Sequence, residues 1–396
     1  MGTIRRQGKG RPTAGRKPQS EDYTSAKATV NRKEEHVQIN VKDDVQSRRN
    51  FFDEITLLHE TLPDVDKDAI DLRLEFLGVP LGAPIMIASM TGGYPGAEAI
   101  NRSLAYAAAE HRLALGVGSQ RAALKSPEMR KTYTSVRDHD VPFVAANIGA
   151  PQLLPQGNAK SLSRDEIESL VSMLEADALI IHLNYLQEVV QPGGDLAARG
   201  ALAAIAGVCE DIGVPVIAKE TGAGLTRNAA KLLARAGVAA IDVGGLSGTT
   251  FAAVELVRAR REGQDQLARL GQLYRDWGIP TPIAVLEAKT AGVPIVATGG
   301  VADGLAAAKG LALGATMAGI AGAALRSAVH GDKAASKFMA MTIDELRTAL
   351  FLTGASDLAC ARERPFLATG LAAEWMRAFG HDPAAFVAGR LGTVSP

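Results

Sequence analysis

Four polar residues that could bind an anion and a divalent cation follow one apolar run of this sequence. His182 and Asn184 come directly after the run, and Gln187 and Glu188 follow within six residues. An isolated histidine at such a position is usually a satisfied core residue, but the polar neighbours indicate a site. Glu188 is a hard oxygen ligand suited to Mg²⁺, which typically takes one or two carboxylates together with phosphate oxygens.

A lysine that ends another apolar run is a second candidate. Lys219 follows Val214 to Ala218, where a buried charge without a partner would be costly. It either forms a structural ion pair with Glu220 or Asp242, or faces an anionic ligand or an electron-rich cofactor ring.

Two glycine segments late in the chain could bind phosphate. They are Gly299-Gly300 and the segment from Gly319 to Gly322. Glycines let backbone N–H groups approach an anion closely, and a following helix adds a favourable dipole. The first segment alone could be a tight turn, but together the two favour a phosphate site.

Motifs for several other chemistries are absent from the sequence. There is no G-x-S-x-G elbow, no G-x-x-x-x-G-K-[ST] loop and no H-E-x-x-H helix. Cys209 and Cys360 are too few for a disulfide framework, and neither lies in a predicted strand-end loop. A cysteine nucleophile is therefore not expected.

Eight short apolar runs must position these side chains. They lack the polar alternation of a one-sided sheet, as expected for parallel strands buried on both faces. The runs are 84–88, 114–117, 142–146, 178–181, 215–218, 239–243, 294–297 and 316–320. Eight strand–helix units in series predict an α/β fold, a single (β/α)8 TIM barrel, whose active site forms at the strand ends. A doubly wound sheet also alternates strands and helices, so the count favours the barrel without proving it.

Local signals mark some of the connecting segments. Thr226 is expected to cap a helix that ends near Gly237. Thr342 and Glu345 form a capping-box pattern, which predicts a helix start there. The stretch 256–285 is too long for a plain loop and is expected to leave the barrel over its mouth.

The composition indicates a globular enzyme. Of 396 residues 47% are hydrophobic, and 43 basic residues balance 43 acidic ones, which argues against a nucleic-acid binder. No apolar run approaches the ~20 residues needed to span a bilayer, and no signal sequence is evident, so we expect no membrane partner and a cytoplasmic location. Residues 1–30 are basic and poor in apolar residues, which predicts a disordered tail. The barrel is expected over 31–380, with a C-terminal extension over 381–396.

These residues resemble the FMN-dependent type 2 isopentenyl-diphosphate isomerases. The resemblance runs from about residue 31 to 355, and its most specific parts are an Arg-Lys-x-x-His and a His-x-Asn-x-x-Gln-Glu segment. The matching segments are 32–36, 90–93, 116–121, 146–147, 182–188, 192–195, 219–220, 248–249, Glu255, 276–281 and 299–300. It implies that the chain moves the double bond of isopentenyl diphosphate to give dimethylallyl diphosphate, with reduced FMN, Mg²⁺ and NADPH as reductant.

The resemblance also implies roles for individual residues. FMN would contact Ala88, Ser89, Met90, Thr91, Ser119, Asn147, Lys219, Gly244, Thr249, Gly300, Val301, Ala302, Ala321 and Gly322. The substrate would contact Arg32, Lys33, His36, Arg121, His182, Asn184 and Gln187. Gln187, His182 and Glu255 would take part in catalysis, and Glu188 would bind Mg²⁺. A homo-oligomer, a tetramer or octamer, is also implied.

Three positions depart from the pattern of this family. Gly244 stands where many members have serine, Ser247 where glycine is usual, and Ala302 where arginine is common. Two rival functions remain. One is an FMN-dependent oxidoreductase acting on a small hydroxy acid, although no convincing His–Arg pair follows the sixth strand. The other is a non-catalytic barrel.

Overall fold

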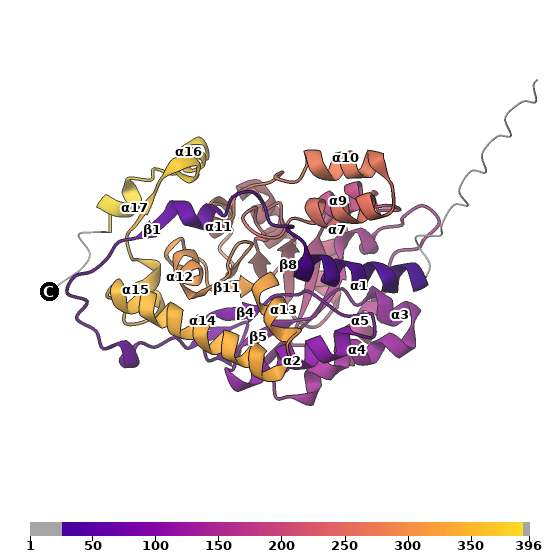
Figure 1. Cartoon of the computed structure of the whole chain (residues 1–396), viewed down its shortest axis with the longest axis horizontal. Coiled ribbons are helices and arrows are strands. Elements are labelled where there is room, and N and C mark those ends of the chain that lie inside the picture. Colours follow the sequence, from indigo (N-terminus) through magenta and orange to yellow (C-terminus); the bar gives the residue numbers. More distant parts are fainter. Residues whose placement is uncertain (1–25, 391–396) are drawn as a thin grey trace, which may run out of the picture.

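Eight parallel strands close into a barrel at the centre of the molecule. The computed structural model describes residues 26–390. The barrel strands are β4 (Ile85–Ile87), β5 (Ala114–Gly116), β6 (Phe143–Gly149), β7 (Ala178–Leu183), β8 (Val216–Glu220), β9 (Ala240–Asp242), β10 (Ile295–Thr298) and β11 (Met317–Ile320). They correspond one for one to the eight apolar runs, so the predicted barrel is confirmed (Figure 1).

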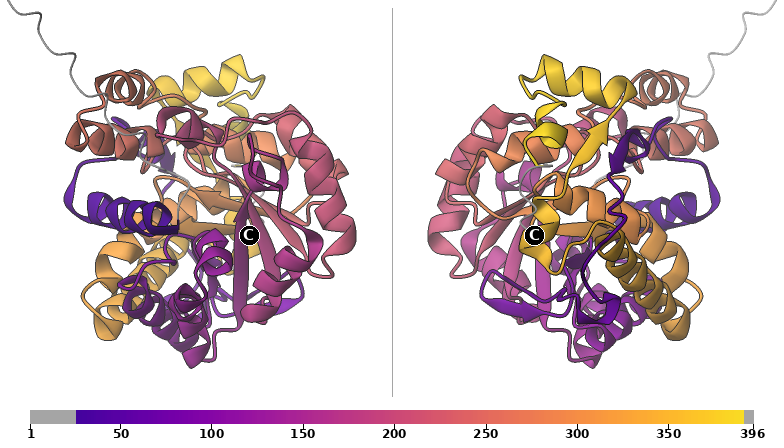
Figure 2. Two further views of the ribbon diagram at one scale, coloured as in Figure 1. Left: turned by 90° about the vertical axis from the view of Figure 1, so that its right-hand side faces the viewer. Right: turned by 90° about the vertical axis from the view of Figure 1, so that its left-hand side faces the viewer.

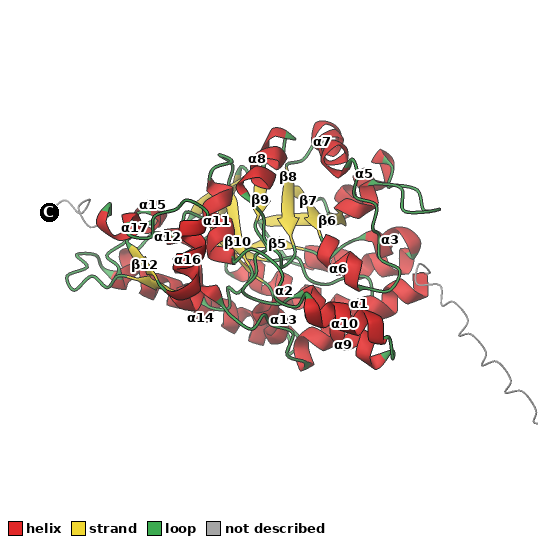
Figure 3. Ribbon diagram, turned by 90° about the horizontal axis from the view of Figure 1, so that it is seen from above, coloured by secondary structure: helices red, strands yellow, loops and turns green. Residues whose placement is uncertain are grey.

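Helices surround the strands, as Figure 3 shows from above. They are α2 (Ala97–Glu110), α3 (Arg121–Lys125), α4 (Lys131–Thr134), α5 (Arg164–Met173), α6 (Tyr185–Val190), α7 (Ala201–Asp211), α8 (Arg227–Arg235), α9 (Phe251–Arg261), α10 (Asp265–Leu273), α11 (Thr281–Lys289), α12 (Gly304–Ala312), α13 (Gly322–Ala328) and α14 (Asp332–Leu352). None of the described helices is long and apolar enough to cross a membrane.

The barrel has a packed interior that is closed at one end. Side chains such as Met86, Phe143 and Ile217 fill it, and Phe76 and Leu81 belong to the same core. These last two residues come from a small hairpin, β2 (Leu74–Phe76) and β3 (Val79–Leu81), which precedes the first barrel strand. With the interior filled by apolar side chains, ligands can enter only from the carboxyl ends of the strands.

Both ends of the described chain pack against the barrel rather than extend from it. Helix α1 begins at Ala26, so the last residues of the expected tail 1–30 are helical, and Thr29 is buried. The rest of that tail, residues 1–25, lies outside the described residues. At the other end, β12 (Phe366–Ala368) pairs with β1 (Ile55–Leu57).

Three C-terminal helices complete this end. They are α15 (Leu358–Arg362), α16 (Gly370–Ala378) and α17 (Ala385–Ala388). Phe386 stacks on Phe366 with ring centroids 4.6 Å apart. The expected C-terminal extension therefore packs on the fold as far as residue 390. Figure 2 shows these helices and α1 on different sides of the barrel.

One local prediction is confirmed and one is wrong. Thr226 caps α8 by accepting a hydrogen bond from the Ala229 N–H. Thr342, in contrast, lies inside α14 and donates to the Phe338 carbonyl, while Glu345 accepts from the N–H of Gly304 at 2.9 Å. Both residues of the predicted capping box lie inside α14, so no helix begins there. Glu345 instead caps the start of α12.

The long segment between the sixth and seventh barrel strands forms two packed helices. Residues 256–285 comprise the end of α9, all of α10 and the start of α11. Helix α9 also packs against α1 and α6, whose residues line the mouth of the barrel. The expected excursion is therefore an ordered helical layer beside the site.

Candidate active site

Two adjoining cavities open at the carboxyl ends of the barrel strands. The first, called here the cationic cavity, has a volume of about 140 Å³. The second, the glycine-lined cavity, has a volume of about 340 Å³. Residues common to both linings are His36, Ser89, Met90, Lys219, Thr221 and Phe251. A ligand in one cavity would therefore contact a ligand in the other.

All seven residues expected to bind substrate line the cationic cavity. Helix α1 contributes Arg32, Lys33 and His36, and Arg121 is the first residue of α3. His182, Asn184 and Gln187 come from the end of β7 and from α6. The structure thus brings together segments more than 140 residues apart.

The two adjacent basic residues of α1 are half-buried, and neither forms an ion pair with a described residue. Lys33 donates from Nζ to the Ser119 carbonyl at 2.6 Å, and burial, aided by the charge of Arg32, lowers the pKa of Lys33 to about 7. Arg32 forms no hydrogen bond or ion pair with any described residue, and burial lowers its pKa as well. An anion entering this cavity would relieve both costs.

His182 is held as a neutral imidazole. Its Nδ1 lies 2.7 Å from Asn147 Oδ1, which places the ring proton on Nδ1. Burial, with smaller effects from Lys33 and Lys219, lowers the pKa of His182 to about 3. His182 therefore contributes a polarisable ring and no positive charge, unless a bound anion restores the proton.

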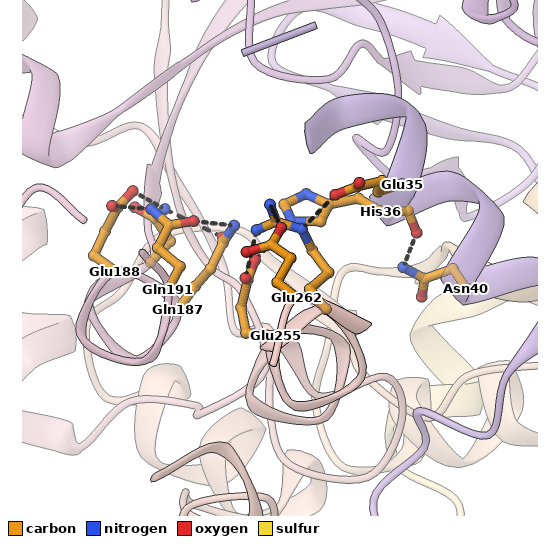
Figure 4. Close-up of polar contacts among 10 residues, drawn as sticks. Glu35, His36, Asn40, Gln187, Glu188, Gln191, Glu255 and Glu262 are labelled. Carbon is orange, nitrogen blue, oxygen red and sulfur yellow. Dashed lines mark hydrogen bonds and ion pairs between the residues drawn. The ribbon is translucent and has the colours of Figure 1, made fainter. Parts of the chain in front are cut away.

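Glu188 is the centre of a buried amide cluster on α6. Its carboxylate accepts hydrogen bonds from Asn184 Nδ2 at 2.8 Å and from the Asp195 N–H at 2.8 Å. It also accepts from Gln191 Nε2, which lies beside it in Figure 4. Burial raises the pKa of Glu188. Asn184 Oδ1 is buried with no hydrogen-bond partner, so a free oxygen donor lies beside the carboxylate.

This donor set fits Mg²⁺ better than a metal that prefers several side-chain ligands. Among residues 26–390 no group of three or more His, Cys, Asp or Glu side chains could hold a metal ion. Mg²⁺ needs only one or two carboxylates when phosphate oxygens complete its shell. Glu188 and the unpartnered oxygen of Asn184 meet that requirement.

Glu255 lies behind His36 and lines neither cavity. It is fully buried and accepts from His36 Nε2 at 2.7 Å and from Arg258 Nη1 at 2.7 Å (Figure 4). Burial acts to raise the pKa of Glu255, but His36 and Arg258 outweigh it and leave that pKa lowered. This placement suits a carboxylate that orients His36, and it differs from the direct catalytic part expected for Glu255.

Lys219 forms an ion pair and also faces the two cavities. Its Nζ lies 2.8 Å from Asp242 Oδ2, and both side chains are buried. Lys219 also lines both cavities, so its ammonium group lies at their boundary, whereas Asp242 lines neither.

Glu220, the next residue along β8, was missed as a positioning residue. Its carboxylate accepts hydrogen bonds from the N–H groups of residues 221–224. Burial raises the pKa of Glu220 to about 7 in spite of these bonds. The carboxylate shapes the turn that carries Thr221 and Gly222 into the glycine-lined cavity.

Most of the expected FMN residues line one of the two cavities. Ser89, Met90, Lys219, Gly244, Thr249, Gly300, Val301, Ala302, Ala321 and Gly322 line the glycine-lined cavity. Thr91, Ser119 and Asn147 line the cationic cavity. Ala88 is fully buried in the barrel wall and lines neither.

The glycine-lined cavity has features that fit a large polar ligand. The hydroxyls of Ser89 and Thr298 are buried without any hydrogen-bond partner, although both residues line the cavity. A Cβ on Gly248 would lie 2.4 Å from the Gly300 nitrogen, so the two backbone segments approach as only glycine permits. These observations fit FMN, which carries a polar ring and a phosphate.

Two of the three departures have a structural explanation. Gly244 has φ +43°, and a Cβ there would lie 1.9 Å from the Glu220 carbonyl, so this backbone has no room for serine. Ser247 uses its hydroxyl to accept from the Phe51 N–H at 3.3 Å. Nothing in the structure explains Ala302.

An N-terminal segment covers the glycine-lined cavity and was not predicted. Gln46 donates from Nε2 to Thr249 Oγ1 at 3.1 Å, and Asn50 donates from Nδ2 to the Gly300 carbonyl at 2.8 Å. Isolated polar residues in a loop carry no sequence signal of this kind. Other lining residues missed from sequence are Asn40, Ser47, Thr221, Gly222, Thr298 and Arg326.

Known proteins similar to this chain fall into two groups. Solved structures similar to it include a lactate oxidase of Pediococcus acidilactici (TM-score 0.57, 16% identity, 85% of this chain and 87% of that chain). A mandelate oxidase with an FMN adduct is similar as well (TM-score 0.56, 14% identity, 85% and 92%). At these identities the likeness shows the barrel fold alone. No protein-family model matches the sequence.

Curated relatives are far more similar in sequence. The isopentenyl-diphosphate delta-isomerase of Methanosarcina barkeri is 42% identical over 351 residues, 88% of this chain and 94% of that protein. The enzyme of the same name from Thermococcus kodakarensis is 44% identical over 364 residues, 90% and 96%. This chain belongs to the isopentenyl-diphosphate delta-isomerase family.

Proposed function

We propose that this protein converts isopentenyl diphosphate to dimethylallyl diphosphate, with reduced FMN in the glycine-lined cavity. The observation that carries the proposal is the joining of the two cavities. An unpartnered arginine lies in the first, glycine backbone and unpartnered hydroxyls lie in the second, and six residues line both. Diphosphate binding and flavin binding are thereby brought side by side.

The diphosphate is bound by the cations of α1 and α3. Arg32 is free to pair with it, while Arg121 is shared with Asp195, at 2.7 Å. Glu188 and Asn184 Oδ1 are the oxygen groups that would hold Mg²⁺, which would neutralise part of the charge of the diphosphate. Anion binding also favours protonated Lys33 and His36, because each gains a negative partner.

The reaction adds one proton to a carbon and removes one from another, with no net change in oxidation state. Reduced FMN supplies the acid–base chemistry when bound. Gln187 orients the hydrocarbon part, since an amide neither gains nor loses a proton near neutral pH. Lys219, fixed by Asp242, keeps a positive charge at the boundary of the cavities, where it stabilises an anionic partner.

An anaerobic assay with single omissions tests this function. Purified protein is given isopentenyl diphosphate, FMN, Mg²⁺ and NADPH, and each component is left out in turn. Dimethylallyl diphosphate should form only when reduced flavin and Mg²⁺ are both present. Formation without flavin, or no formation with all components and a bound-flavin spectrum, contradicts the proposal.

A further inference from the structure

Three basic side chains line the described part of the glycine-lined cavity, and two of them already have acidic partners. His36 is bound to Glu255 at 2.7 Å, and Lys219 is bound to Asp242 at 2.8 Å. The third, Arg326, forms no hydrogen bond or ion pair with any described residue. Its side chain is exposed and lies on α13. This cavity therefore offers one free positive charge along residues 26–390.

The guanidinium of Arg326 folds back over the glycine four residues before it. A Cβ on Gly322 would lie 3.2 Å from Arg326 Nη1 and 3.5 Å from Thr249 Oγ1. The guanidinium of Arg326 and the hydroxyl of Thr249 therefore lie on two sides of the position that a side chain at residue 322 would occupy. This space is open because residue 322 is glycine. Gln46 holds Thr249 in place from the other side, at 3.1 Å.

A phosphate monoester carries more charge than this pocket would otherwise neutralise. Ala302, which follows the glycine pair and Val301, has no charge, and the other polar groups at this end are hydroxyls, the amides of Gln46 and Asn50, and backbone. A phosphate bound by neutral donors alone would leave its charge uncompensated, and arginine matches phosphate oxygens with paired N–H donors.

We propose that Arg326 binds the phosphate of the flavin mononucleotide and makes this chain select FMN over riboflavin. The inference rests on the proposed function, because that function places a flavin in this cavity. Arg326 thus supplies from α13 the cation that Ala302 lacks. Arg326 lines the glycine-lined cavity and not the cationic cavity, so we assign it to flavin binding and give it no part in the proton transfers.

The test measures the affinity of the purified chain for FMN and for riboflavin by quenching of flavin fluorescence. Wild type should bind FMN at least about tenfold more tightly than riboflavin. Arg326→Gln should weaken FMN binding by about tenfold or more and leave riboflavin binding unchanged. Arg326→Lys should keep part of the difference in affinity between FMN and riboflavin. It keeps the positive charge but loses the paired N–H donors of the guanidinium.

A matched control removes the same charge elsewhere. Arg235→Gln changes an exposed arginine at the end of α8 that lines neither cavity, and it should alter neither affinity. Unchanged FMN affinity in Arg326→Gln, or equal loss for both flavins, would overturn the inference. Wild type that binds neither flavin overturns it together with the proposed function. Wild type that binds FMN but forms no product overturns the proposed function alone.

Discussion

Arg32 and Lys33 enter the cationic cavity side by side, and neither forms an ion pair with a described residue. Burial lowers the pKa of both residues, and the charge of Arg32 lowers that of Lys33 further, so an anion bound here would stabilise both positive charges. Lowered pKa values of this kind are typical of functional sites. The same cavity contains Glu188, which gives a second, oxygen-rich side suited to a divalent cation.

The pKa of Lys33, about 7, predicts a pH dependence. Below this pH the free enzyme carries the charge that attracts the diphosphate, and above it the charge is lost. We expect kcat/KM to fall as the pH rises through about 7. Lys33→Met should have a lower kcat/KM that no longer falls as the pH rises through about 7. Lys131→Met, on the exposed side of α4, should show the same fall as wild type. The same fall of kcat/KM in Lys33→Met would contradict the assignment of this pH dependence to Lys33.

Replacement of Glu188 by glutamine tests the metal site. Glu188→Gln keeps the shape and the amide neighbours but removes the negative charge that holds Mg²⁺. We expect kcat/KM to fall on the order of 100-fold, with an increased Mg²⁺ requirement and unchanged flavin affinity. Kinetics over a Mg²⁺ titration measures both effects. Glu168→Gln, on the exposed face of α5, is the control, and near wild-type kinetics in Glu188→Gln refutes the site.

At the scale of elements, α1 is an added helix that the barrel pattern does not contain. Arg258 of α9 connects the two helices. It donates to Glu35 of α1 and to Glu255 of α9, both at 2.7 Å. His36 of α1 completes the contact with Glu255. This network helps to position the three residues of α1 that are proposed to bind substrate, together with the bond from Lys33 to the Ser119 carbonyl.

We expect Glu255→Gln to loosen that attachment. The KM for isopentenyl diphosphate should rise about tenfold, because α1 is less well placed, while flavin affinity stays unchanged. Glu262→Gln is the matched control, since Glu262 also accepts from Arg258, at 3.3 Å, whereas Glu255 binds both Arg258 and His36 of α1. An unchanged KM in Glu255→Gln would show that the pair does not position α1.

The barrel strands could be predicted from sequence because a parallel strand buried on both faces is a local apolar run. The glycine pair and Thr226 were equally local signals. The strap formed by Gln46 and Asn50 could not be predicted, since its partners lie about 200 residues or more away. The helix start predicted at Thr342 was wrong because a local capping pattern does not exclude a longer helix. Helix α14 begins ten residues earlier, at Asp332.

The cap of α8 gives a stability prediction. Thr226→Ala removes the hydrogen bond to the Ala229 N–H, so the free energy of unfolding should drop by about 1 kcal/mol. Urea denaturation measures this change. Thr348→Ala, on the exposed face of α14, removes only a bond to the carbonyl of Asp344 within the helix and should change little. Equal losses in the two variants would contradict the capping role.

At the scale of the whole molecule, several apolar side chains face outward on one side of the barrel. Val189, Leu196 and Leu202 are 48%, 62% and 38% exposed, on and between α6 and α7. Apolar surface of this kind is commonly buried between subunits. We therefore expect this face to be buried between subunits of the tetramer or octamer that the family resemblance implies, and light scattering after gel filtration measures the mass. The mass of a single chain at micromolar concentration would contradict this expectation.

The joined cavities should carry out an isomerisation in which the flavin is needed but not consumed. The most direct measurement is the ratio of dimethylallyl diphosphate formed to NADPH oxidised under anaerobic conditions. An isomerase should form many molecules of product for each NADPH, because the reaction involves no net redox change. One NADPH consumed for each product, or no product from a flavin-loaded protein, would contradict the claim.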